Sequence, residues 1–126
     1  MKKSVILIGI FLSACSNLNF DNISYDRFIS ISERAAKMEA SCTNVEQTRS
    51  DAVVLLDNVN HMDNYAKHRT VSPEVALSVN SLQSLVQEFN DKYLNSAFPS
   101  KVYCEQKLKN ISIMANSISE TIGKLN

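Results

Sequence analysis

Apolar residues recur at steps of three and four over the first half of the chain, beginning near Ser24. This spacing places side chains on one stripe of a helix. Arg49 and Asp63 interrupt the stripe. Its members are Phe28, Ile31, Ala35, Met38, Cys42, Val45, Ala52, Leu56, Val59 and Ala66. The pattern predicts helix from about residue 24 to 69.

A second signal competes with a single helix over this stretch. Thr43-Asn44-Val45-Glu46 fits a capping box, in which Thr43 would begin a new helix. The block is therefore either one helix of some 65 Å, at about 1.5 Å per residue, or two helices broken near residues 41–44. We favour the break.

Two prolines separate the later helices. Ser72-Pro73-Glu74 is a helix start, with serine as N-cap, proline in the first turn and an acid beside it. Pro99 ends that block, and a last helix is expected from Ser100 or Lys101. The predicted core stripes are Val75, Val79, Leu82, Val86, Phe89 and Tyr93, then Cys104, Leu108, Ile111, Ala115, Ile118, Ile122 and Leu125.

The N-terminal segment has a different character. Lys2 and Lys3 precede an apolar run from Val5 to Leu12, which is the layout of an export signal and is too short to span a bilayer stably. It ends in Leu12-Ser13-Ala14-Cys15, which resembles the lipobox of bacterial lipoproteins. The resemblance implies cleavage before Cys15, acyl chains on that cysteine and, with Ser16 following, the periplasmic face of the outer membrane.

This resemblance divides the chain into a signal (1–14), a tether (15–23) and a domain (24–126). The tether reaches roughly 30 Å at no more than about 3.5 Å per residue. With Cys15 lipidated, Cys42 and Cys104 remain as an even pair in an oxidising compartment, where a disulfide is the expected state.

The fold class follows from these elements. Only two glycines and two prolines occur, whereas sheet proteins of this size use many of both in turns. We predict an all-α fold, a small antiparallel bundle of three to four helices stapled by one disulfide. Folding the chain back near residue 70 brings Cys42 and Cys104 to the same end of the bundle, whichever helix count holds.

Charge and motifs narrow the function. The chain carries 13 Lys+Arg and 13 Asp+Glu, and losing Lys2 and Lys3 with the signal leaves 11 against 13. That balance disfavours nucleic-acid binding and attraction to anionic lipid. The sequence has no Gly-x-Ser-x-Gly, phosphate-binding loop or His-Glu-x-x-His. We therefore expect neither an enzyme nor a cofactor.

One set of side chains resembles a metal site. Asp57, His61 and His68 share a helix face, and imidazole with carboxylate can bind zinc or copper. The face lies away from the apolar stripe, however, and residues seven apart are separated by about 10 Å along a helix. We expect these three to be solvated polar residues and the metal site to be absent.

Other residues indicate contact with a partner. Phe98 and Tyr103 lie close to the expected disulfide, and aromatic residues are enriched in interfaces. Phe98 can equally fill the end of the bundle. Apolar residues outside the main stripes either form a partner surface or widen the core: Ile29, Val53, Leu85 and Ile113.

The function expected is that of a non-enzymatic interaction module that binds another envelope protein, as an accessory subunit or as an inhibitor or exclusion factor. The alternative is a metal- or small-ligand-binding bundle. Self-association through the extra apolar residues is a further possibility.

Overall fold

The computed structural model describes residues 22–68, 72–95 and 99–124. Over these residues the chain forms four α-helices and one short 3-10 turn. Their bounds are α2 (Asn22–Met38), η1 (Glu39–Ser41), α3 (Val45–Lys67), α4 (Pro73–Leu94) and α5 (Lys101–Gly123). The all-α prediction is confirmed, with four helices.

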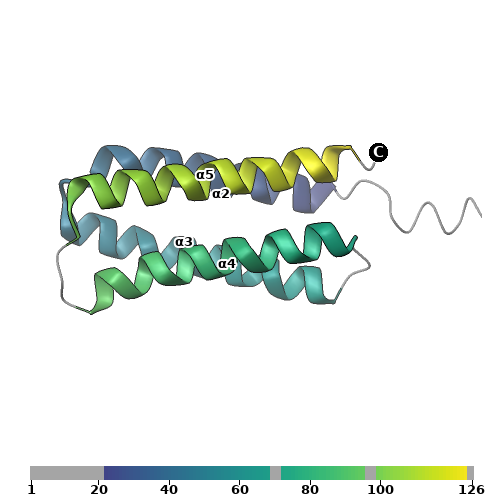
Figure 1. Ribbon diagram of the computed structural model, residues 1–126, viewed down its shortest axis with the longest axis horizontal. Coiled ribbons are helices and arrows are strands. Elements are labelled where there is room, and N and C mark those ends of the chain that lie inside the picture. Colours follow the sequence, from purple (N-terminus) through teal and green to yellow (C-terminus); the bar gives the residue numbers. More distant parts are fainter. Residues whose placement is uncertain (1–21, 69–71, 96–98, 125–126) are drawn as a thin grey trace, which may run out of the picture.

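Successive helices run in opposite directions and form two layers (Figure 1). Helix α2 lies against α5 in one layer, and α3 lies against α4 in the other. Contacts between the layers are fewer and join α4 to α5 and α2 to α3. This is an up-down-up-down four-helix bundle. The start of α2 and the end of α5 share one end of the bundle, and the α2–α3 connection lies at the other.

The predicted break near residues 41–44 is confirmed, but its cap differs from the prediction. Asn44, not Thr43, is the N-cap of α3, and its Oδ1 accepts a hydrogen bond from the Gln47 backbone N–H at 3.1 Å. Asparagine caps helices at least as well as threonine. Glu46 is therefore not a capping-box acid and instead forms an ion pair with Arg49 at 2.7 Å.

The starts of the last two helices match the prediction. Ser72 Oγ accepts from the Val75 N–H at 3.2 Å, with Pro73 in the first turn of α4. Ser100 Oγ accepts from the Tyr103 N–H at 3.1 Å at the start of α5. Each serine satisfies a backbone donor that the helix leaves unpaired.

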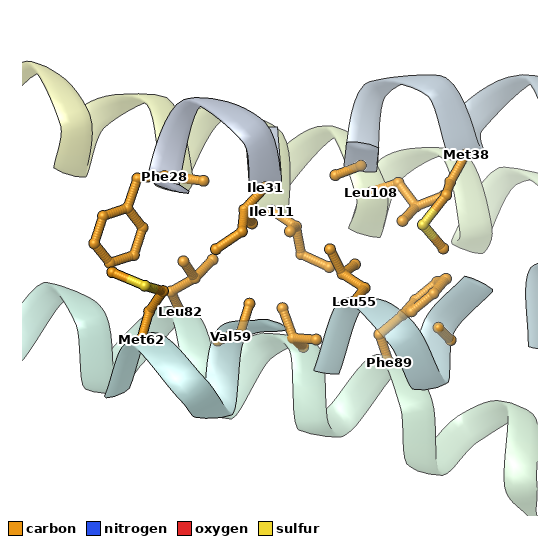
Figure 2. Packing of buried hydrophobic residues seen from close by; sticks show 14 of the residues in the cluster. Phe28, Ile31, Met38, Leu55, Val59, Met62, Leu82, Phe89, Leu108 and Ile111 are labelled. Atoms are coloured by element: carbon orange, nitrogen blue, oxygen red, sulfur yellow. The ribbon is translucent and has the colours of Figure 1, made fainter. Parts of the chain in front are cut away.

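The core lies between the two layers, and large side chains from both fill it (Figure 2). All six predicted stripe residues of α4 are buried, as are those of α5 up to Ile122; Leu125 lies outside the described residues. In α2, Phe28, Ile31, Ala35 and Met38 are buried as predicted.

The stripe predicted for α3 is wrong in part. Ala52 and Val59 are fully buried, but the other core positions are Thr48, Leu55 and Met62. The predicted residues Val45, Leu56 and Ala66 are only half-buried at the edge of the core. The break at residues 39–44 resets the helical phase, so the stripe extrapolated from α2 does not continue into α3.

The Cys42–Cys104 disulfide is present. Its Cα atoms are 5.8 Å apart and its cysteines are 62 residues apart in sequence. Both residues are buried, at 5% and 0% exposure. The bond joins the turn after α2 to the first turn of α5 at the end of the bundle opposite the first residue of α2.

A pair of serines ties α2 to α5 nearer the middle of these helices. Ser32 Oγ donates to the Ser112 carbonyl at 2.8 Å, and Ser112 Oγ donates to the Ser32 carbonyl at 3.0 Å. The two hydroxyls are also 3.0 Å apart. Such reciprocal bonds need the two backbones close together.

Reducing the disulfide should lower the free energy of unfolding by about 4 kcal/mol, because a 62-residue loop is then no longer constrained in the unfolded chain. Urea unfolding followed by circular dichroism measures this difference. The Cys42→Ala/Cys104→Ala double variant should match the reduced protein. Equal midpoints for the oxidised and reduced protein would contradict this role.

Candidate interaction surface

Three aromatic residues meet where α4 and α5 pack, at the disulfide end of the bundle. The Phe89 ring stacks on the Tyr103 ring, with 6.5 Å between centroids and 10° between planes. Phe89 also contacts Tyr93 in a tilted arrangement at 5.0 Å. Phe89 and Tyr93 are buried, whereas Tyr103 is half-buried and reaches the surface.

Local structure fixes the position of Tyr103. Its backbone N–H is bonded to the Ser100 cap, and the next residue is the disulfide-bonded Cys104. The ring therefore projects from a helical turn that a cap and a covalent bond both constrain. A constrained aromatic side chain loses little conformational entropy when a partner binds it.

Two lysines approach the Tyr103 ring from different helices. The Nζ of Lys92, on α4, is 5.6 Å from the ring centroid, and the Nζ of Lys107, on α5, is 5.7 Å from it. Both distances allow a cation–π attraction. Lys107 also forms an ion pair with Glu88 across the helices, at 3.2 Å.

The surroundings of the two tyrosines raise the pKa of both phenols. Burial is the main cause of the raised pKa of Tyr93, and the nearby Tyr103 adds to it. Burial also raises the pKa of Tyr103; Lys107 acts to lower that pKa, and Glu88 acts to raise it. Both side chains are thus neutral hydrogen-bonding groups at physiological pH.

Arg49 supports this end of the bundle from α3. Its Nε donates to the Tyr93 carbonyl at 3.1 Å, and its Nη1 pairs with Glu46. The Tyr93 carbonyl lies in the last turn of α4, where carbonyls lack helical partners and a cation is favourable. This explains a charged residue in the apolar stripe of the sequence.

The other predicted contact residues are dispersed. Phe98 lies outside the described residues. Val53 and Ile113 are exposed, at 51% and 57%, on different layers of the bundle. Ile29 is half-buried, and Leu85 packs against the core, so Leu85 widens the core as the alternative reading held.

The three residues considered for a metal lie on the outside of α3. Asp57, His61 and His68 are all exposed, and the His68 Nδ1 is 2.8 Å from the Asn64 carbonyl. Among the residues that the structure describes, no group of three His, Cys, Asp or Glu side chains is placed to hold a metal ion.

Hollows on the described surface are shallow and open to solvent. One follows the α2–α3 seam beside Ser30, Arg34 and Lys37, and another lies over α4 beside Gln87 and Lys92. Both are lined mainly by polar and charged side chains. They resemble the rim of a protein interface more than the enclosed apolar pockets that hold small ligands.

The predicted lipid attachment site, Cys15, lies outside the described residues. Within residues 22–68, 72–95 and 99–124, none of the helices combines the length and the apolar character needed to cross a bilayer.

Tyr103 was a candidate contact residue from the sequence alone, whereas the charged residues around it were not. Lys92, Lys107 and Glu88 read as ordinary surface charges. One signal was available, because Tyr103 and Lys107 are four residues apart and so share a helix face, as do Glu88 and Lys92. The sequence does not show how far α4 and α5 are shifted along each other, so it could not show that the Glu88/Lys92 pair lies beside the Tyr103/Lys107 pair.

No family model, curated protein sequence or solved structure matches this chain.

The raised pKa values predict how stability depends on pH. Above the usual tyrosine pKa of 10.0, the folded protein retains phenol protons that the unfolded chain has lost. Below about pH 10 both phenols are protonated in the folded and the unfolded chain, so their ionisation does not affect the free energy of unfolding. As pH rises through that value, the unfolded chain ionises first and the free energy of unfolding should fall.

Tyrosinate absorbance and urea unfolding across this pH range measure the effect. The Tyr93→Phe/Tyr103→Phe variant should lose the phenol ionisation above the usual pKa and show a weaker alkaline loss of stability. The idea is wrong if the variant and the parent protein have the same dependence on pH.

Proposed function

We propose that this protein is a lipoprotein of the bacterial envelope, anchored at Cys15 to the periplasmic face of a membrane, which acts by binding another envelope protein. The observation that carries the proposal is the order of residues in the N-terminal segment. Lys2 and Lys3, the apolar run and Leu12-Ser13-Ala14-Cys15 follow the order of a lipoprotein signal. The bundle then serves as the binding module, as an accessory subunit or as an inhibitor or exclusion factor.

The cysteine usage supports an exported location. Structural disulfides form and persist in oxidising compartments and are rare in the cytosol. The Cys42–Cys104 bond uses both cysteines of the domain and leaves Cys15, the residue of the lipobox-like motif, as the odd one. An odd cysteine at this position is what acylation would require.

The layout of the bundle suits a tethered binding protein. Helix α2 begins at Asn22, a few residues after Cys15, so the anchor would attach at the end opposite the disulfide. The α4–α5 surface around Tyr103 would then point away from the membrane. Confinement to a thin layer raises the effective concentration of the module towards a partner in the same envelope.

The polar side chains favour binding over catalysis or ligand storage. An active site needs convergent titratable groups in a sheltered pocket. Here His61 is exposed on α3, His68 is exposed at its C-cap, and the hollows beside Arg34 and Lys92 are open. The metal- or small-ligand-binding alternative would rest on Asp57, His61 and His68. Asp57 and His61 line an open hollow with Arg27, but no three ligating side chains among the described residues are placed to hold a metal ion.

Formaldehyde cross-linking in cells, followed by purification and mass spectrometry, tests the proposal. The full-length protein should capture one dominant envelope protein. Cys15→Ser should remove the anchor, release the domain from the membrane fraction and reduce the yield about tenfold or more, since the gain from tethering is lost. His61→Ala, an exposed change on α3, is the matched control and should behave like the parent protein.

Capture of no other protein, or only of a second copy of the chain, would contradict the proposed function. An undiminished yield from Cys15→Ser would contradict the role of the anchor.

A further inference from the structure

The half-buried Tyr103 ring has two lysine side chains beside it. Two ammonium groups converge on the ring, from Lys92 and Lys107, and they come from different helices. Of these two, only Lys107 forms an ion pair, with Glu88. Lys92 is exposed and forms no ion pair with any described acid.

Asp91, the acid next to Lys92 in sequence, is hydrogen-bonded to a different side chain. The Asp91 carboxylate accepts a hydrogen bond from Gln87 Nε2 at 2.9 Å. On α5, Glu105 forms an ion pair with Lys101 at 3.6 Å. The ammonium of Lys92 thus lies near an aromatic ring and forms no ion pair with a described acid, although Glu88 and Asp91 line the same hollow.

On this arrangement we propose that Lys92, Tyr103 and Lys107 form the contact site for an aspartate or glutamate side chain of the partner protein. This inference rests on the proposed function and adds the chemistry that the partner must present. The carboxylate accepts charge-assisted hydrogen bonds from Lys92 and, by exchange with Glu88, from Lys107. The Tyr103 hydroxyl, which keeps its proton at physiological pH, is a third donor.

The site is preformed, which reduces the cost of binding. Tyr103 is held by the Ser100 cap, the stacked Phe89 ring and the neighbouring disulfide at Cys104. A partner that binds here orders two lysine side chains and leaves the backbone unchanged. Interface tyrosines with flanking cations are common positions of strong binding energy when a partner covers them.

The position of Tyr103 in the bundle favours a protein, and not a lipid headgroup, as the source of the bound anion. Tyr103 lies in the first turn of α5, and this helix of 23 residues spans about 35 Å. The first residue of α2, which follows the proposed anchor, lies at the opposite end of the bundle (Figure 1). Lipids of the anchoring membrane are therefore remote from Lys92 when the bundle stands on its tether.

A zero-length carbodiimide cross-linker tests this contact, because it joins a lysine amine to a carboxylate only when the two touch. It is applied to cell envelopes that contain the full-length protein, and the joined peptides are mapped by mass spectrometry. Intramolecular products at Lys107–Glu88 and Lys101–Glu105 show that the reagent reaches this surface. We expect amide links from Lys92 or Lys107 to an aspartate or glutamate of one other protein.

Charge-reversed variants separate this site from the rest of the surface. Lys92→Glu removes one reactive amine, so the link from Lys107 is the one to compare. Its yield should fall about tenfold or more, because like charges then oppose each other in the interface. Tyr103→Phe should cause a smaller loss, since the ring remains. Lys109→Glu, an exposed lysine elsewhere on α5, is the matched control and should leave the yield unchanged.

The possible failures are distinguishable. If formaldehyde still captures a partner but carbodiimide links map elsewhere, or persist in Lys92→Glu, the carboxylate site is wrong and the proposed function stands. If neither reagent captures another protein, the proposed function fails as well. Binding of the parent protein, but not of Lys92→Glu, to phosphatidylglycerol vesicles would make the anion a lipid headgroup and would overturn the inference.

Discussion

The pairing of α2 with α5 is the constraint on which the rest of the bundle depends. These are the first and last helices described, so their contact closes a loop over nearly the whole domain. Loop closure of this length is entropically costly. The disulfide fixes the pair at one end, and the reciprocal Ser32–Ser112 bonds fix its register farther along. The α3–α4 layer packs its large side chains against this pair.

This arrangement gives the two ends of the bundle different properties. The end that carries the disulfide also holds the Asn44 and Ser100 caps and the Arg49 bond to α4. The opposite end carries the start of α2, where the proposed anchor would attach. With that anchor, the disulfide end would lie away from the membrane, as the proposed binding surface requires. We propose that Lys92 and Lys107, beside Tyr103, give this binding a preference for carboxylates.

Much of the fold is predictable because helical periodicity and capping are local signals. Ser72-Pro73 and Ser100 fixed two helix starts, and the α4 stripe was predicted in full. Leu55 and Met62 were missed because the break before α3 resets the phase by an amount that depends on the turn geometry. The neighbours of Tyr103 were missed because Lys92 and Phe89 lie on α4 and Tyr103 lies on α5. Only the packing of the two helices brings them together.

The mass of the native protein shows directly whether a disulfide-stapled bundle is attached to a membrane through Cys15. The protein would be extracted from membranes of its own host and measured intact, then again after digestion without reduction. We expect a chain that begins at an acylated Cys15, with Cys42 and Cys104 in one linked pair of peptides. A chain that retains residues 1–14, or that carries an unmodified Cys15, would contradict it.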